Sequence, residues 1–502
     1  MTRSPAVLAT AAFLFSVVAV GGGCNFGQSG IEPPANRIFL PAGIVADPDE
    51  DLLYVVNSNS DLRFNAGTIA VVDLAKVWAA RAQAAAVCSK TRFSRTEPVL
   101  DTYCCRDMID SNVLNCNEPQ FIQGDATVSL GSFGGAIQLQ RFERGGEVVR
   151  RLFVAVRAEP SITYADVTVN NGMASIRCTG PRQGGAAQPA GAYCDDNWRL
   201  RRPSGVTPGA LVLPEEPHVL ALDDTRGILF AGHLTVTANS QVQGGGISTI
   251  DVCNPQSDSS VRFAGLARTT FLPATLSQAV ASISPGDPAH PATRVFATAR
   301  YSAAISGMVL RSPAQESCPP PAVDAPARDL TMVPSESFYS SAFLPHGADI
   351  RGILFSADDR GRKAYVLHRN DVDTSANPAA LAVLDRTPLA DGSVANTPTA
   401  VLQLCGGPTA MQMRNTGRGD RIYVTCYDDG QIYVVDPVAL AIVAVIDAGA
   451  GPTSLVFSPL HPGIAYIASF ANSHLSVIDL EPGSPTENRV ILRIGLPHGY
   501  GE

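Results

Sequence analysis

The chain has 502 residues, of which 17% are charged, and a formal net charge of −9. An acidic chain without a concentrated basic face does not fit nucleic-acid binding, so no nucleic-acid partner is expected. Glycine (44 residues) and proline (37 residues) are frequent, which favours a chain with many turns and few long helices.

The first 23 residues have the pattern of an export signal. Arg3 precedes an uncharged, apolar-rich run over residues 6–20, which has the length of a signal-peptide core and is short for a membrane span. The run ends in Gly-Gly-Gly-Cys24, and small residues before a cysteine resemble the lipobox of bacterial lipoproteins, although Gly21 stands where that family usually has leucine. The resemblance implies cleavage before Cys24 and lipidation of its sulfur.

The lipobox resemblance also implies a location. It predicts a partner membrane held through the lipid anchor, in the cell envelope, with the outer membrane favoured because Asn25 follows the cysteine. An ordinary secretory signal peptide and a retained transmembrane helix remain the alternatives. Residues 24–36 are polar and predict a tether between the anchor and a folded body.

Ten cysteines follow Cys24, and an even number in an exported chain indicates disulfides. We expect Cys178 to pair with Cys194, Cys253 with Cys318, and Cys405 with Cys426. The remaining four, Cys88, Cys104, Cys105 and Cys116, predict two further bridges of open connectivity. Because no pair has CxxC spacing and no cysteine precedes a histidine at ligand spacing, neither a metal nor a cofactor is expected.

One short strand with an aromatic second residue recurs seven times. It occupies residues 53–57, 152–156, 229–233, 295–299, 364–368, 422–426 and 465–469. Small and β-branched residues follow the aromatic one, which fits a strand buried on both faces between neighbouring sheets. A second strand often follows after a turn and ends near aspartate, as at Asp73, Asp251 and Asp436.

These strands resemble the YVTN family of β-propellers. Residues 422–425 nearly match its signature, and Gly451-Pro452-Thr453 followed by Val456-Phe457-Ser458 matches the start of a blade. The resemblance implies an all-β, seven-bladed β-propeller over about residues 37–499, with the closest match in the last three blades. The blades are expected near residues 41–74, 132–167, 217–252, 275–310, 347–386, 408–437 and 452–495.

Long insertions separate the early blades. They span residues 75–125, 168–215, 253–272 and 311–343, each after the third strand of a blade, and hold eight of the ten cysteines. We expect them to emerge on one face of the propeller as a disulfide-linked cap over blades one to four. Residues 74–87 predict a short helix that packs through Leu74, Trp78, Ala82 and Ala85.

The ring requires one end of the chain to complete the last blade. Leu-Pro-x-Gly occurs near both ends, at residues 40–43 and 496–499, and each copy follows a stretch that resembles an outer strand. Either residues 37–40 or residues 489–494 could supply that strand. We favour residues 489–494, which need no crossing of the chain from the other end.

The ends of the aromatic strands supply the candidate ligand site. At the sixth position of these strands stand Ser58, Arg157, Leu234, Arg300, Arg369, Tyr427 and Phe470. The three arginines predict a rim that binds an anion, because guanidinium groups present forked donors to carboxylate or phosphate. His233 and His368 lie one position earlier, while His218 and His346 stand at starts of inner strands. The alternative is a solvated rim whose arginines pair with Asp371, Asp428 and Asp429.

No catalytic motif is present, neither a G-x-S-x-G elbow, a phosphate-binding loop nor H-E-x-x-H. The function predicted is therefore a binding or scaffolding propeller whose partner is a protein or a small anion. The alternative is a periplasmic hydrolase resembling the propeller lactonases, with a site in the central channel. A channel lined by convergent carboxylates or histidines would favour the enzyme, whereas one lined by Ser and Thr would favour the binding module.

Overall fold

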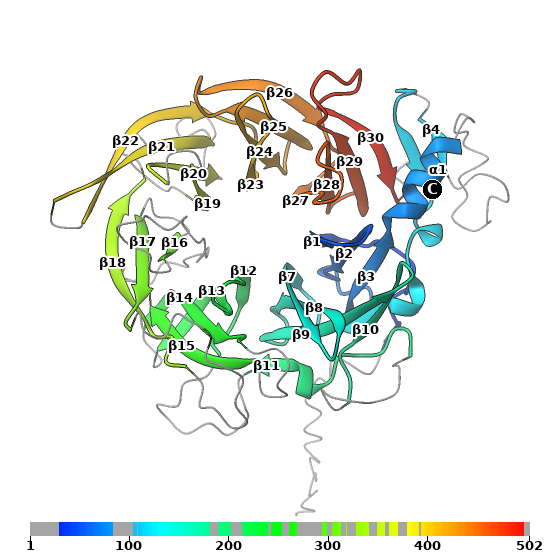
Figure 1. Cartoon of the computed structure of the whole chain (residues 1–502), viewed down its shortest axis with the longest axis horizontal. Helices are drawn as coiled ribbons and strands as arrows, with labels where there is room; N and C mark the ends of the chain where they lie inside the picture. Colours follow the sequence, from blue (N-terminus) through cyan, green and yellow to red (C-terminus); the bar gives the residue numbers. More distant parts are fainter. Residues whose placement is uncertain are drawn as a thin grey trace, which may run out of the picture.

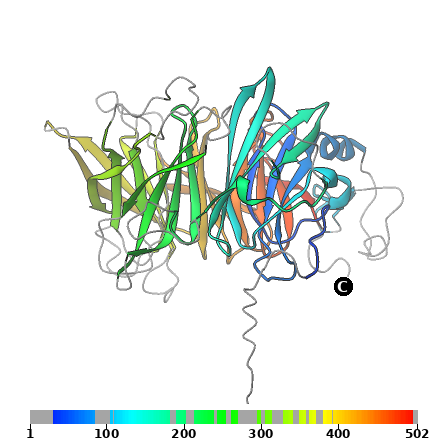
Figure 2. The ribbon, with the colours of Figure 1, turned by 90° about the horizontal axis from the view of Figure 1, so that it is seen from below.

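Seven antiparallel sheets form a ring around a central axis in the computed structural model of the chain (Figures 1 and 2). The structure describes residues 30–83, 104–107, 109–180, 189–201, 213–238, 242–253, 261–268, 294–298, 304–312, 318, 328–340, 349–356, 361–369, 379–390 and 393–495. The predicted all-β, seven-bladed propeller is thus confirmed. Cys24, Cys88, Arg300 and His346 lie outside the described residues.

The first four blades carry the longer connections. Blade one holds β1 (Pro41–Ala46), β2 (Leu52–Asn57), β3 (Gly67–Asp73) and β6 (Val128–Leu130). Blade two holds β7 (Gly134–Arg144), β8 (Glu147–Val156), β9 (Ser161–Asn170) and β10 (Met173–Arg177), with β11 (Arg199–Arg201) also on β9. Blade three holds β12 (Pro217–Asp223), β13 (Ile228–Ala238), β14 (Val242–Asp251) and β15 (Arg262–Arg268). The described strands of blade four are β16 (Arg294–Thr298), β17 (Ala304–Leu310) and β18 (Met332–Tyr339).

The last three blades are more regular. Blade five holds β19 (Asp349–Phe355), β20 (Lys363–Arg369), β21 (Ala380–Pro388) and β22 (Val394–Gln403). Blade six holds β23 (Pro408–Asn415), β24 (Asp420–Cys426), β25 (Gln431–Asp436) and β26 (Ala441–Asp447). Blade seven holds β27 (Pro452–Phe457), β28 (Ile464–Ser469), β29 (His474–Asp479) and β30 (Arg489–Ile494). The C-terminal strand therefore completes the last blade, as predicted.

The aromatic residue of each repeated strand fills the seam between two blades. Its seven occurrences, Tyr54, Phe153, Phe230, Phe296, Tyr365, Tyr423 and Tyr466, are all buried. Because side chains alternate along a strand, the aromatic ring faces one neighbouring blade and the small residue beside it faces the other. The sequence pattern thus reflects packing of the core.

The aspartate that ends the third strand has a turn-forming role. The carboxylate of Asp436 accepts hydrogen bonds from the backbone N–H groups of Val438 and Ala439, both at 2.9 Å. These bonds hold the pKa of Asp436 below its usual value. Asp479 accepts in the same way from Glu481 N–H at 2.9 Å. The recurring aspartate is therefore part of the turn chemistry of the blade.

The insertion of blade one runs to the outer edge of the ring. Helix α1 (Leu74–Gln83) and strand β4 (Cys104–Arg106) lie there beside β30 (Figure 1). Strand β5 (Leu114–Cys116) adds to β30 in parallel and pairs with β4. The described part of this insertion thus covers the edge of blade seven, whereas the sequence predicts a cap over blades one to four.

The predicted helix is present, but its packing face differs from the expectation. Leu74 and Val77 are buried in the core between blades seven and one, and Trp78 packs against that core. Ala82 is exposed, and Ala85 lies outside the described residues. The expected contacts are thus confirmed at Leu74 and Trp78, whereas the one expected at Ala82 is wrong. Among the described residues, no helix has the length and apolarity to cross a membrane.

Four disulfides link described residues. They are Cys104–Cys116, Cys178–Cys194, Cys253–Cys318 and Cys405–Cys426, and the last three are the pairs that the sequence predicts. Cys105 is also disulfide-bonded. Three short 3-10 turns, Glu118–Gln120, Gly124–Ala126 and Asp196–Trp198, lie in the connections.

Candidate binding surfaces

The sixth residues of the repeated strands form a rim on one face of the ring. In four of the described cases the backbone N–H donates to a carbonyl at the entry to the inner strand of the same blade. These bonds are Ser58 to Leu40 (3.0 Å), Leu234 to Glu216 (3.1 Å), Tyr427 to Gly407 (3.0 Å) and Phe470 to Gly451 (2.8 Å). The N–H of Arg157 reaches Phe133 in the same way, at 3.3 Å. The rim positions are therefore equivalent, as the alignment of the strands predicts.

Three rim residues on adjacent blades stack on one another. The guanidinium of Arg369 lies 6.0 Å from the ring centroid of Tyr427. The rings of Tyr427 and Phe470 are 6.5 Å apart and tilted by 47°. All three side chains are half-buried. We call Arg369, Tyr427 and Phe470 the rim ladder. Tyrosine and arginine are among the side chains that most often dominate the binding energy of protein interfaces.

Two carboxylates hold the turn beneath the ladder. Asp428 lies 3.8 Å from Arg369, and Asp429 accepts a hydrogen bond from the N–H of Gly406 at 2.7 Å. Gly407 has a φ of +59°, and a Cβ there would lie 2.2 Å from an oxygen of Asp428. Glycine is thus required where the turn folds over the start of the inner strand.

The other described rim arginine lies apart from the ladder. Arg157, on blade two, is 3.6 Å from Glu216, and both side chains are more than a third exposed. Both described rim arginines therefore have a carboxylate neighbour, which is the alternative that the sequence left open. An anion at either place would compete with a weak, solvent-screened ion pair.

The two histidines of the repeated strands are buried below the rim. His233 is fully buried, with Nδ1 2.9 Å from the carbonyl oxygen of Glu215 and Nε2 2.8 Å from Ser248 Oγ. Burial lowers its pKa to about 4. His368 occupies the equivalent position in blade five, is also fully buried, and has its pKa lowered by burial to about 4. Neither ring is exposed to a ligand on the rim.

The fifth position of these strands has a structural role in several blades. Asn57 donates to the carbonyl of Arg37 at 3.1 Å, and Ser469 donates to that of Ala448 at 2.9 Å. Cys426 makes the corresponding link through its disulfide with Cys405. His233 makes the same kind of link through its Nδ1, which lies 2.9 Å from the carbonyl oxygen of Glu215. In these four blades the position ties the strand to the connection that enters the blade.

The inner strands line the axis of the ring (Figure 1). Thr409 donates to the carbonyl of Pro452 at 2.9 Å, and Thr453 donates to that of Pro41 at 3.3 Å. These bonds join blade six to seven and blade seven to one. His218 and Arg351 stand at the equivalent bulge positions of β12 and β19. The Nε of Arg351 donates to Asp349 at 2.9 Å. The described residues hold no group of three or more His, Cys, Asp or Glu arranged for a metal ion.

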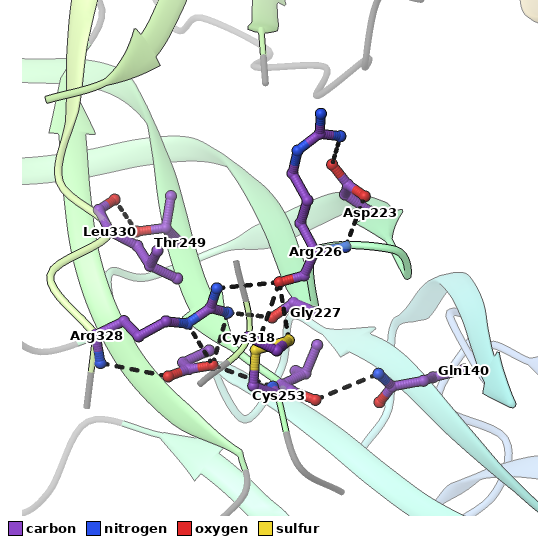
Figure 3. Close-up of polar contacts among 11 residues, drawn as sticks. Gln140, Asp223, Arg226, Gly227, Thr249, Cys253, Cys318, Arg328 and Leu330 are labelled. Atoms are coloured by element: carbon purple, nitrogen blue, oxygen red, sulfur yellow. Dashed lines mark hydrogen bonds and ion pairs between the residues drawn. A yellow bond between two sulfur atoms is a disulfide. The ribbon is translucent and has the colours of Figure 1, made fainter. Parts of the chain in front are cut away.

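Buried ion pairs join adjacent blades at their outer parts. Figure 3 shows Arg328, which precedes β18, reaching into blade three. Its Nη2 donates to Asp251 at 2.8 Å and to the carbonyl of Gly227 at 2.7 Å. The disulfide between Cys253 and Cys318 lies beside this arginine. Sequence inspection missed the cluster because its members lie up to 102 positions apart.

A hollow of about 460 Å³ lies on the outer wall between blades six and seven. Val445 and Asp447 of β26 form one side, and Arg489 and Arg493 of β30 form another. The third side is formed by the insertion residues Asp107, Ile109, Asp110 and Val113. A second hollow of about 200 Å³ adjoins it at Asn488 and is lined by Val443. No local sequence pattern predicts this hollow, because three distant segments build it.

Comparisons with known proteins bear on the fold. No protein-family model and no curated protein matches the chain. Among solved structures, hydrazine synthase of Kuenenia stuttgartiensis is similar with a TM-score of 0.48 and 13% identity, over 90% of this chain and 98% of that one. The periplasmic gluconolactonase of Pseudomonas aeruginosa is similar with a TM-score of 0.44 and 14% identity, over 82% of this chain and 87% of that one. At these TM-scores and identities, neither likeness assigns a function to this chain.

Proposed function

We propose that the protein is a binding or scaffolding β-propeller of the cell envelope, anchored through a lipid on Cys24. The observation that carries the binding role is the rim ladder, where Arg369, Tyr427 and Phe470 of three adjacent blades stack at one face. Aromatic and arginine side chains are the types that most often dominate protein interfaces. The partner is a protein, or a small anion that Arg369 holds.

The inner strands support a binding role over catalysis. Thr409 and Thr453 use their hydroxyls to join neighbouring blades. Buried charges of the outer parts, such as Arg328 and Asp251, pair with each other across seams. Groups engaged in this way stabilise a rigid ring, and a rigid ring presents its rim without a large ordering cost on binding.

A photo-crosslinking experiment tests the rim. We would place p-benzoylphenylalanine at Tyr427 in the envelope-bound protein, and at exposed Tyr339 of β18 as the control. The expected result is one adduct specific to position 427 that Arg369→Ala reduces at least fivefold. The same adducts from both positions, or no effect of Arg369→Ala, would overturn the rim as the binding face.

The small-anion form of the proposal has its own test. Titration with inorganic phosphate and with citrate should show saturable binding that Arg369→Ala weakens. Arg418→Ala, which removes an exposed arginine of blade six, is the matched control and should leave binding unchanged. Equal affinity of the parent, Arg369→Ala and Arg418→Ala would exclude a small anion held by Arg369. A protein partner would then be the remaining form of the proposal.

The anchor is tested independently. Mass spectrometry of membrane-extracted protein should find acyl groups on a chain that begins at Cys24. Cys24→Ala should release the protein from the membrane fraction. An unmodified N-terminus further along the chain would contradict the lipoprotein proposal and leave a secreted propeller.

A hydrolase resembling the propeller lactonases is the second candidate. The observation in its favour is His218, which stands at the bulge near the start of β12, the inner strand of blade three. Hydrolysis of glucono-δ-lactone by the purified protein, lost in His218→Ala and retained in Arg369→Ala, would favour it. An unchanged rate in His218→Ala would exclude this histidine as the catalytic group.

A further inference from the structure

The outer strand of blade six is an open sheet edge of unusual composition. β26 reads Ala-Ile-Val-Ala-Val-Ile-Asp and, within the described part of the chain, pairs with β25 alone. It contains no glycine, proline or lysine, the residues that commonly protect an edge from further pairing. Val445, near its middle, is 49% exposed. Such an edge has donors and acceptors available for another strand.

Blades four and five protect the corresponding edge. The outer strand of each of blades three to seven has a β-bulge at the same place. The residue before this bulge is Pro334 in β18 and Pro398 in β22, but Ile442 in β26. Proline cannot donate to a ladder and is a normal means of blunting an edge. Blade six lacks this device, as do blades three and seven, which have Phe263 and Val490 at this position.

Blade seven shows what such an edge accepts. β30 has the same bulge and pairs beyond it with β5 in parallel, through Leu492–Ile494. The equivalent residues of β26, by their pairing with the third strand, are 444–446. Strand addition at this position is therefore compatible with the blade geometry, and the bulge does not prevent it.

The hollow beside β26 offers space for an added side chain. Val445, Ile446 and Asp447 form its blade-six side. Ile109, which is 94% exposed, and Val113 of the insertion lie across from them. At the seam between blades seven and one the insertion of the chain itself, through α1 and β5, covers the equivalent region. At the seam between blades six and seven, the residues that the structure describes leave the hollow open.

We propose that β26 is a docking edge for an extended segment of a partner polypeptide. The segment adds to residues 444–446 as β5 adds to β30, by main-chain hydrogen bonds, and places an apolar side chain against Val445 and Ile109. Recognition of this kind takes affinity from the backbone and specificity from a pocket for alternate side chains. This edge lies away from the rim ladder. A negative result at one of the two sites therefore does not contradict the proposal for the other.

A labelled peptide probes the edge directly. The probe carries residues 111–118 with Cys116→Ser, which is the segment that already adds to β30. The control peptide carries Leu114→Pro and Asn115→Pro in addition and cannot form the ladder. We expect saturable binding of the probe by fluorescence anisotropy, no binding of the control, and slower hydrogen exchange across residues 442–447.

Two matched variants decide the location. Val445→Lys places a charge on the edge at a half-exposed position and should weaken binding at least tenfold without lowering the melting temperature. Val401→Lys makes the same change at the equivalent position of β22, where the valine is 36% exposed, and should leave binding unchanged. Equal weakening by both variants, or no saturable binding of the probe at about 1 mM, a concentration that detects even weak complexes, would overturn the proposal.

A second copy of the chain is the competing occupant. Analytical ultracentrifugation over a range of protein concentrations should show a monomer. A dimer that Val445→Lys dissociates would show that β26 joins two copies, and would replace the partner segment.

Discussion

Arg150 and Asp47 form a buried ion pair across the seam between blades two and one. Arg150 Nε lies 2.8 Å from Asp47 Oδ2, and the two side chains are 3% and 0% exposed. Tyr54 donates its hydroxyl to the same carboxylate oxygen at 2.8 Å. Burial is the largest cause that raises the pKa of Tyr54, so this tyrosine stays a neutral donor. Asp49 and Glu50 also lie 3.5 Å and 3.8 Å from Arg150, but both are more than a third exposed, so Asp47 is its buried partner.

Removal of Arg150 should destabilise the ring strongly. Arg150→Met leaves the Asp47 carboxylate buried without its counter-charge, and breaking a buried pair of this kind costs about 3–5 kcal/mol. The free energy of unfolding, measured in urea at pH 7, should fall by that order. Arg418→Met is the control, because Arg418 pairs with Glu487 while 58% exposed, and surface pairs contribute little. Equal losses in the two variants would contradict a special role of the seam.

Gly227 should tolerate no side chain. Its φ is +60°, and a Cβ would lie 2.7 Å and 2.8 Å from the sulfurs of Cys318 and Cys253. Gly227→Ala should therefore combine backbone strain of about 1–2 kcal/mol with an overpacking cost of about 1–3 kcal/mol.

Gly172→Ala separates the two costs. Gly172 also has a positive φ, +75°, but a Cβ there meets nothing within 4 Å. The melting temperature of the Gly172→Ala variant should fall less than that of Gly227→Ala, because only the backbone strain of a positive φ applies. An equal fall would mean that the contact with the disulfide is relieved by a small shift of the chain.

The disulfide beside Gly227 should contribute more than the shorter ones. The Cys253–Cys318 bridge closes a separation of 65 residues and the Cys104–Cys116 bridge one of 12. The chain-entropy model then gives about 4 kcal/mol for the first and about 3 kcal/mol for the second. Paired alanine variants of each bridge, unfolded in urea, test the order. The reverse order would show that native contacts such as those of Arg328 outweigh loop entropy.

The ring was predictable from the sequence because its signals are local. Tyr54, Phe153 and Tyr466 each occupy the same place in a short strand, and their burial follows from the alternation of side chains. The closing strand, β30, was predictable for a similar reason, since it continues the order of strands within its own blade.

The candidate sites were less predictable because they depend on distances between segments. His233 is buried, whereas the next residue along the strand lies on the rim. The sequence alone does not show which of two such neighbouring positions is buried. The hollow beside β26 depends on the pairing of β5 with β30, residues more than 370 positions apart, which no local pattern encodes. The ladder was visible as a set of aligned positions, but the stacking of Arg369 on Tyr427 required the curvature of the ring.

The buried histidines predict a specific loss of stability in acid. Burial lowers the pKa of His233 and of His368 to about 4, while an unfolded histidine titrates near 6.5. The unfolded chain thus binds more protons than the folded one between these values, and stability falls as the pH falls through this window. Above pH 6.5 the contribution is fully present. At pH 5 the loss is about 2 kcal/mol for each histidine.

Glutamine at these positions should flatten the dependence. His233→Gln keeps a donor and an acceptor near Glu215 and Ser248, the two partners of the ring, but cannot take up a proton. The free energy of unfolding of this variant should fall less steeply between pH 7 and pH 5 than that of the parent. His368→Gln should act in the same direction, and the two effects should add because the residues lie in separate blades. An unchanged slope in the double variant would show that both rings gain their proton without leaving the folded state.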